Sequence, residues 1–205
     1  MTHIVNEVTA YDRKRMKVTL DEGDVTFLLY KGEMRSAGMT ADAENQEIDV
    51  ASYRKIMDEI LLPRGKKRAV HYLEKGDRTE FQIRAKLKEG LYPECVIEGV
   101  MEWLRKYKFA DDERLTENYV NQMAGYYSRR EIEAKLFRKG LKGENVKQVL
   151  DGISYEDEYA ACERALLKKG ADTEKKKLFA YLAGKGFSFD MIEECIEKNC
   201  SAEDY

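Results

Sequence analysis

Apolar and polar side chains alternate along the first 31 residues of the chain. Three short runs follow this pattern, and the polar segment Asp21-Glu22-Gly23-Asp24 separates the second run from the third. A period of two residues is typical of a β-strand, and an acidic segment with a glycine is typical of a turn. The pattern therefore predicts a small antiparallel sheet. Its apolar positions are Ile4, Val5, Val8, Met16, Val18, Leu20, Val25, Phe27 and Leu29.

Helical spacing replaces the alternation after a polar segment, Gly32 to Glu47, that two glycines interrupt. Apolar residues between Ile48 and Leu62 recur every three or four positions, which predicts a helix. Proline resists continuing a helix, so we expect this helix to end at Leu62-Pro63-Arg64-Gly65. We therefore predict a first segment, residues 1–62, made of a β element and a linker helix.

One phrase recurs three times in the remainder of the chain. It reads TEFQIRAKLKEGL at 79–91, SRREIEAKLFRKGL at 128–141 and TEKKKLFAYLAGKGF at 173–187. When Gly90, Gly140 and Gly186 are aligned, apolar residues follow one, six and ten positions later in each copy. An internal repeat of this length indicates a modular array. The repeat predicts three modules, at residues 66–108, 109–153 and 154–200.

Each module is predicted to contain three short helices. Ser128 with Glu131, and Thr79 with Gln82, fit the capping box that begins a helix. The glycine that ends the phrase fits a left-handed C-cap, and Pro93 fits the first turn of the next helix. A further helix precedes each phrase. Three short helices bury little surface, so we expect neighbouring modules to share one core. The preceding helices are predicted at Lys66–Lys75, Asp112–Met123 and Asp157–Lys169.

The composition argues against a membrane protein and against a protein with an overall basic surface. Charged residues make up 37% of the 205 residues, the net charge is −3, and no long apolar segment or secretory signal occurs. These features predict a protein without a membrane segment and without an overall basic surface. The four cysteines form no CxxC pair, which favours reduced thiols in a cytoplasmic protein. We expect Cys95, Cys162, Cys195 and Cys200 to be small buried apolar side chains.

The sequence offers little catalytic chemistry. His3 lies near the chain start, His71 fits a surface or packing role, and no zinc-ligand spacing occurs. The acidic run Asp111-Asp112-Glu113 fits the start of a helix, where carboxylates are favourable. Trp103 lies on the apolar face of a predicted helix, so we expect it to be partly buried. We predict no enzyme activity and no cofactor.

Two stretches, 126–142 and 164–177, are net positive despite the acidic total. Cations beside aromatic rings can hold phosphates and stack on bases, although a solvated helix face explains them as well. We take six residues as candidate contacts for a partner or DNA. A third cluster, Arg64, Lys66, Lys67 and Arg68, fits a linker contact or solubility as well as DNA. The six candidates are Tyr126, Arg129, Arg130, Lys139, Lys168 and Lys169.

The order of motifs resembles the RecX family, whose members modulate the bacterial recombinase RecA. The resembling segments are AVHYLEKGDRTEFQIRAKL (69–87), WLRKYKFADDERLTENYV (103–120), SRREIEAKLFRKGL (128–141) and LAGKGFSFDMIEECI (182–196). The resemblance implies a mostly α protein with a small N-terminal β element and an elongated, curved array of three tandem three-helix modules. It also implies a monomer that lodges in the groove of the RecA filament on single-stranded DNA and restrains recombinase, ATPase and co-protease activity in the SOS response.

Two other functions remain open from the sequence. A helical-repeat scaffold could bind a different protein without DNA, and an independent module could bind DNA directly through its basic patches. The sequence does not decide which RecA surface is contacted.

Overall fold

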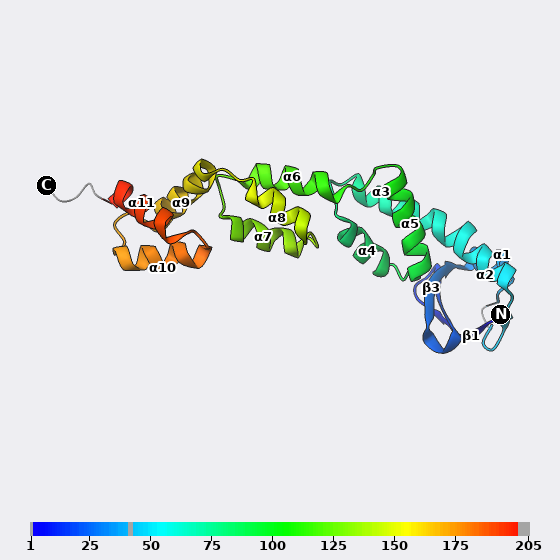
Figure 1. The fold of residues 1–205 in the computed structure, drawn as a ribbon. Coiled ribbons are helices and arrows are strands. Elements are labelled where there is room, and N and C mark those ends of the chain that lie inside the picture. The colour runs from blue at the N-terminus through cyan, green and yellow to red at the C-terminus, as the bar shows by residue number, and fades with distance from the viewer. Residues whose placement is uncertain (1, 41–42, 201–205) are drawn as a thin grey trace. The chain divides into compact units, whose positions relative to one another are not determined.

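The computed structural model describes residues 2–40 and 43–200. The chain divides into two compact units, unit 1 (Met1–Asp111) and unit 2 (Asp112–Tyr205), whose elements are drawn in Figure 1. The predicted mostly α fold with an N-terminal β element is confirmed. Residues 1–62 and 66–108 lie in the first unit, and the second unit holds the predicted ranges from Asp112 onwards.

Unit 1 begins with the predicted antiparallel sheet. Strands β1 (His3–Ala10), β2 (Arg15–Leu20) and β3 (Val25–Tyr30) pair in sequence, and the short β4 (Glu47–Ile48) pairs with the free edge of β1. A 3₁₀ turn, η1 (Asp21–Gly23), connects β2 to β3 where a turn was expected. One face of the sheet is buried in the core of unit 1, as alternation requires.

The segment after the sheet is more ordered than its polar composition indicated. Helix α1 (Lys31–Ser36) follows β3 directly, and β4 lies near the end of the same segment. The buried methionines Met34 and Met39 anchor this segment to the core of unit 1. Buried apolar side chains, Ala37 and Ala43 among them, therefore order a segment that local composition describes as a connection.

The prediction that Pro63 ends a helix is wrong. Helix α2 (Val50–Arg54), the π-helical turn η2 (Lys55–Leu61) and α3 (Leu62–Leu73) form one uninterrupted helical run. Pro63 stands in the first turn of α3, and the amide of Leu62 bonds to the carbonyl of Met57, five residues back. The wide turn accommodates the missing proline N–H, so the helix continues through the ring.

The sheet and the first three-helix module share one core. Helices α4 (Glu80–Lys88) and α5 (Glu94–Lys106) complete this module with α3. Gly65 on α3 lets the backbone approach α5 closely, because a Cβ at this position would lie 3.0 Å from a methyl of Val100. Arg64 ties α3 to the end of the sheet by donating hydrogen bonds to the carbonyl of Leu28 and to Glu33.

Unit 2 contains the second and third three-helix modules. Each module has its own apolar cluster, and the two clusters are separate. The expectation that neighbouring modules share one core is therefore wrong for this pair, because polar contacts join them. The helices of the second module are α6 (Asp112–Met123), α7 (Arg129–Arg138) and α8 (Glu144–Asp151), and those of the third are α9 (Tyr155–Lys169), α10 (Lys175–Lys185) and α11 (Phe189–Cys200).

Both predicted capping boxes are confirmed. The hydroxyl of Thr79 accepts from the amide of Gln82, and that of Ser128 accepts from the amide of Glu131, each at 3.2 Å. Both glutamine and glutamate side chains return a bond to the capping residue's amide. Pro93 stands one position earlier than expected, because it is the N-cap of α5.

The glycine caps are confirmed in two modules and wrong in the first. Gly140 and Gly186 have φ angles of +85° and +96°, in the left-handed region that favours glycine. In the first module the left-handed residue is Leu91, with φ +53°. Gly90 serves close packing instead, since a Cβ there would lie 2.9 Å from the Tyr92 ring.

The structure tests the predictions made for the cysteines, for Trp103 and for the acidic run at the start of α6. Cys162 and Cys195 are fully buried, but Cys95 is exposed because it lies off the apolar face of α5. The side chain of Cys200 lies outside the described part of the structure. Trp103 is partly buried, as expected, and packs on the core of unit 1. Asp112 and Glu113 begin α6, where acidic residues were expected.

Both histidines pair with an acidic side chain. His3 belongs to β1 rather than to a frayed end, where it bonds Asp21 at 2.5 Å and stacks on Tyr53 at 3.9 Å. His71 is exposed beside Glu74, which confirms its surface role. Among the residues that the structure describes, no helix is long and apolar enough to span a membrane.

Candidate protein and nucleic-acid interface

A polar junction joins the second and third modules inside unit 2. Ser128 begins α7, is fully buried, and donates its hydroxyl proton to the carbonyl of Lys185 at 2.5 Å. The Lys185 ammonium donates to Glu131 at 2.6 Å, and this bond raises the pKa of Lys185. The start of α7 therefore holds the end of α10 by a hydroxyl and an ion pair. We call these contacts the module junction.

Arg129, a predicted contact residue, belongs to the module junction. Its guanidinium donates to the carbonyl of Ile153 at 2.7 Å, and its Nε lies 2.9 Å from the carboxylate of Glu158. Glu158 is only 14% exposed, so the pair is shielded from solvent. Much of the charge of Arg129 is therefore used inside unit 2.

Arg130 lies at the same junction, against Gly186. A Cβ at Gly186 would lie 2.7 Å from both Cβ and Cδ of Arg130, so only glycine leaves room for the arginine stem. The side chain of Arg130 is exposed, and no ion pair with another described residue occupies it. Its stem therefore serves packing, while its charge remains open to a partner.

Tyr126 is the exposed aromatic of the set. It is 62% exposed, and the guanidinium carbon of Arg164 lies 4.1 Å from its ring centroid. Such a cation–π pair joins α9 to the loop before α7 and presents a flat face beside a positive charge. Arg164 belongs to the second basic stretch, 164–177, but in the structure it contacts Tyr126 of the first stretch, 126–142.

The three lysines of the prediction make none of the hydrogen bonds of the module junction, although Lys169 shares the Tyr181 ring with Lys185 of that junction. Lys139 follows the end of α7, where its ammonium lies 5.2 Å from the Tyr119 ring. Lys168 and Lys169 end α9 and are both exposed, and the ammonium of Lys169 lies 5.4 Å from the Tyr181 ring. From Glu158 to Lys168 the rise of α9 is about 15 Å, so the six candidates do not form one compact site.

Cation–aromatic pairing is the recurring surface feature of unit 2. Lys135 adds a further pair, 4.0 Å from the ring of Tyr127. Counts of charge along the sequence indicated basic stretches, but they missed Arg164, Tyr119 and Tyr181 as members of these pairs. The available signal was the recurrence of tyrosine near each basic stretch. The arrangement can bind anions weakly at several points, or an acidic protein face.

The two buried cysteines of the third module form a hydrogen-bonded pair, and the bond from Cys162 lowers the pKa of the Cys195 thiol. The hydrogen bond with Cys195, together with burial, raises the pKa of the Cys162 thiol far above its usual range. A thiol that stays protonated is a weak nucleophile. In the described residues, no group of histidine, cysteine, aspartate and glutamate side chains has the arrangement of a metal site.

The sequence of this chain is similar to proteins of known family. Residues 66–104 match the family model "RecX, first three-helix domain", and residues 156–196 match "RecX, third three-helix domain". The "Regulatory protein RecX" of Clostridium acetobutylicum is 32% identical over 162 residues, covering 74% of this chain and 76% of that protein. The protein of the same name from Clostridium perfringens (strain SM101 / Type A) is 30% identical over 201 residues, covering 94% and 93%.

Two solved structures share the fold. A crystal structure of regulatory protein RecX aligns with a TM-score of 0.63 over 96% of this chain and 99% of that chain, at 22% identity. The crystal structure of RecX from Lactobacillus salivarius aligns with a TM-score of 0.57 over 67% and 96%, at 21% identity.

Proposed function

The chain belongs to the RecX family of regulatory proteins, and from this premise we propose that it binds the RecA filament on single-stranded DNA and restrains it. The restraint acts on ATP hydrolysis, strand exchange and the co-protease activity of the SOS response. It acts in the cytoplasm, as a monomer and without catalysis of its own. The observation that carries the proposal is the match to RecX relatives over nearly the whole chain.

The fold supports a binding role. Modules of the same three-helix plan offer several similar surfaces along one chain, which suits a partner that itself repeats. In unit 2 the module junction fixes two modules to each other through Ser128, Glu131 and Lys185. A fixed pair of modules loses little conformational entropy when it contacts two successive subunits of a filament.

Steric and electrostatic contacts supply the mechanism. We assign Lys139, Lys168 and Lys169 to contacts with the filament, because they end helices at the surface of unit 2. Arg129 acts by positioning, since its charge is used at the module junction. Arg130 and Tyr126 present a charge and an aromatic face beside that junction. A molecule held across adjacent RecA subunits blocks the motion that each cycle of ATP hydrolysis needs.

The test is a titration of the protein into RecA filaments on single-stranded DNA, with ATP hydrolysis as the readout. The wild type is expected to inhibit hydrolysis. Lys168→Glu with Lys169→Glu is expected to raise the concentration for half inhibition by roughly tenfold, since exposed ion pairs contribute up to about 1 kcal/mol each. Arg54→Glu with Lys106→Glu makes the same charge change on unit 1 as a control.

Three outcomes separate the proposed function from its rivals. No inhibition by the wild type at molar excess over RecA favours a scaffold for another protein. Tight, steeply salt-dependent binding to naked DNA, with no effect on RecA, favours an independent DNA-binding module. If both double variants lose inhibition equally, Lys168 and Lys169 are not specific contacts, but the proposed action on RecA still stands.

A further inference from the structure

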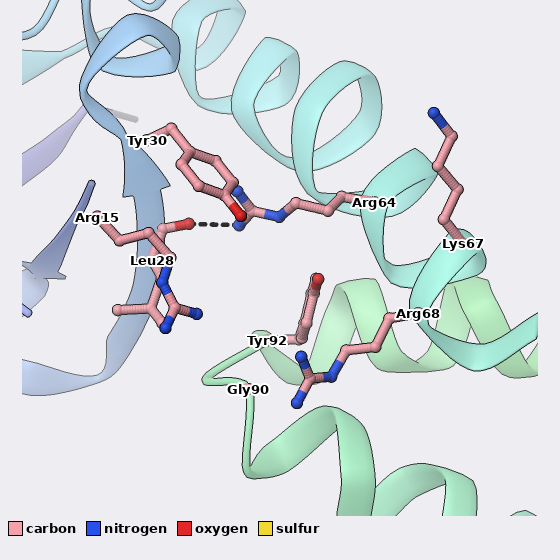
Figure 2. A pocket seen from close by; sticks show the side chains of 8 residues that line it. All are labelled: Arg15, Leu28, Tyr30, Arg64, Lys67, Arg68, Gly90 and Tyr92. Atoms are coloured by element: carbon pink, nitrogen blue, oxygen red, sulfur yellow. Dashed lines mark hydrogen bonds between the residues drawn. The ribbon is translucent and has the colours of Figure 1, made fainter. Parts of the chain in front are cut away.

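A pocket of about 260 Å³ opens in unit 1 where the sheet meets helix α3 and the loop before α5 (Figure 2). Its walls come from β2, β3, α3 and the loop at Gly90, so segments far apart in sequence build it. The volume lies below the usual range of drug-sized ligand sites and suits a small group. The lining side chains that matter are Arg15, Tyr30, Arg64, Lys67, Arg68 and Tyr92.

Two of the four cations are fixed by acidic partners. Arg15 pairs with Asp12 at 2.7 Å, and Arg64 pairs with Glu33 at 2.7 Å. Arg64 also donates to the carbonyl of Leu28, as the dashed line in Figure 2 shows. These bonds hold the two guanidinium groups in place, so they form a rigid wall of the pocket.

The other two cations carry charge without an acidic partner. Neither Lys67 nor Arg68 has a carboxylate within ion-pair distance among the described residues. Arg68 makes one long hydrogen bond, 3.4 Å, from Nε to the carbonyl of Lys86, which leaves the end of its guanidinium open. Glu89, which precedes Gly90, pairs with Lys86 at 2.7 Å, and the charge of Arg68 also helps to lower the pKa of Glu89. The pocket thus keeps surplus positive charge.

Two tyrosine rings complete the pocket. The guanidinium carbon of Arg64 lies 5.4 Å from the ring centroid of Tyr30 and 5.6 Å from that of Tyr92. Tyr30 is 42% exposed, whereas Tyr92 is 8% exposed. Figure 2 shows the Tyr92 hydroxyl directed toward Arg64 and away from the Arg68 guanidinium. An exposed ring beside open guanidinium donors can stack on a base while the donors hold a phosphate.

We propose that this pocket binds a phosphate group, and that the phosphate belongs to the backbone of a single-stranded nucleic acid. Arg68 supplies charge and donors, Lys67 adds charge from the rim, where its side chain points away from Arg68 (Figure 2), and Tyr30 stacks on the adjoining base. Unpaired bases are free to stack, whereas bases in a duplex are covered by their neighbours. The site lies in unit 1, apart from the candidate residues of unit 2, and it does not depend on any action on RecA.

The test measures binding of a fluorescein-labelled oligothymidylate by fluorescence anisotropy, without RecA, over a series of salt concentrations. Lys67→Gln with Arg68→Gln removes the two open cations and leaves the structural Arg64 intact. Its matched control is Arg54→Gln with Lys106→Gln, which removes one arginine and one lysine elsewhere on unit 1. Both control side chains are exposed, and Lys106 lies at the far end of α5.

The pocket variant is expected to bind roughly fivefold more weakly at about 0.1 M salt for each phosphate that it no longer neutralises. Its logarithmic salt slope is expected to fall by about 0.7 for each such phosphate. The control is expected to change affinity by less than about twofold, since its side chains lie outside the pocket. Thermal unfolding followed by circular dichroism checks that both variants fold as the wild type does.

Competition identifies the source of the phosphate. Displacement of the oligonucleotide by inorganic phosphate or thymidine monophosphate supports a site that also takes free phosphate esters. Displacement only by unlabelled oligonucleotide supports the backbone phosphodiester. Equal weakening in the pocket variant and the control, unchanged binding by the pocket variant, or no binding by the wild type would each overturn the proposal.

Discussion

The buried hydroxyl of Ser128 provides the sharpest test of the module junction. The substitution Ser128→Ala removes two interactions with one atom: the cap on the Glu131 amide and the bond to the Lys185 carbonyl. Loss of an N-cap costs about 1 kcal/mol. Leaving the part-buried carbonyl of Lys185 without its donor costs up to about 1–3 kcal/mol more. We therefore expect the free energy of unfolding to fall by about 2–4 kcal/mol.

Urea unfolding followed by circular dichroism measures this change. With a denaturant slope of about 1–3 kcal/mol per molar urea, the midpoint of the unfolding transition is expected to fall by roughly 1–2 M. Hydrogen exchange read by mass spectrometry locates the effect, which should be faster exchange in α7 and α10. The helices of unit 1 should keep their protection.

Ser154→Ala is the matched control. Ser154 caps α9 in the same way, accepting from the Asp157 amide at 3.0 Å, but it is exposed and bonds no other helix end. Its replacement should cost only the cap, about 1 kcal/mol. Equal destabilisation by the two substitutions would mean that the bond from Ser128 to Lys185 contributes nothing to stability.

Two further predictions follow from the geometry of unit 2. Gly186→Ala should destabilise more than Gly38→Ala in thermal unfolding, because both glycines stand at a helix end with positive φ, but a Cβ at Gly186 also meets Arg130, whereas that at Gly38 meets open space; equal effects would contradict this. The hydrogen bond to Glu194 raises the pKa of Tyr155 to about 12. A raised folded-state pKa gives stability that is present below about pH 10 and diminishes as pH rises toward about 12. An ultraviolet titration of wild type against Tyr155→Phe should place this phenol near its raised pKa of about 12, and a midpoint near the ordinary value of about 10 would count against the bond.

Local patterns predicted the local structure. The alternation that places Val18 and Phe27 on one face depends only on the strand period, and the capping boxes at Thr79 and Ser128 involve residues three apart. These features need no knowledge of distant contacts, so the sequence reveals them. The three-helix plan follows from them and from the repeat, although the exact start of α3 and the cap after α4 did not.

Features that depend on tertiary packing were missed. The helix continues through Pro63 because Ile56, Met57 and Leu61 are buried in the core of unit 1, which stabilises a π-helical turn that a local rule does not foresee. Gly90 was misread for the same reason, since its neighbour is the Tyr92 ring and not a helix end.

The sequence predicted which residues are basic, but not which of those charges are already paired within the protein. Charge along the sequence identified Arg129 and the lysines after it, but it cannot tell which charges are already paired. Glu158 neutralises Arg129 from the next module, and Lys185 reaches Glu131 across 54 positions. In the pocket beside Arg64, distant residues instead add to a basic cluster. Arg15 and Tyr92 line this pocket, although the sequence did not place them near Arg64.

Electron cryo-microscopy of RecA filaments on single-stranded DNA, with this protein added to saturation, shows whether the protein binds across RecA subunits. We expect extra helical density in the filament groove, repeating with the protomers and touching two adjacent RecA subunits. Filaments that remain bare under these conditions, or density confined to free DNA, would contradict this expectation.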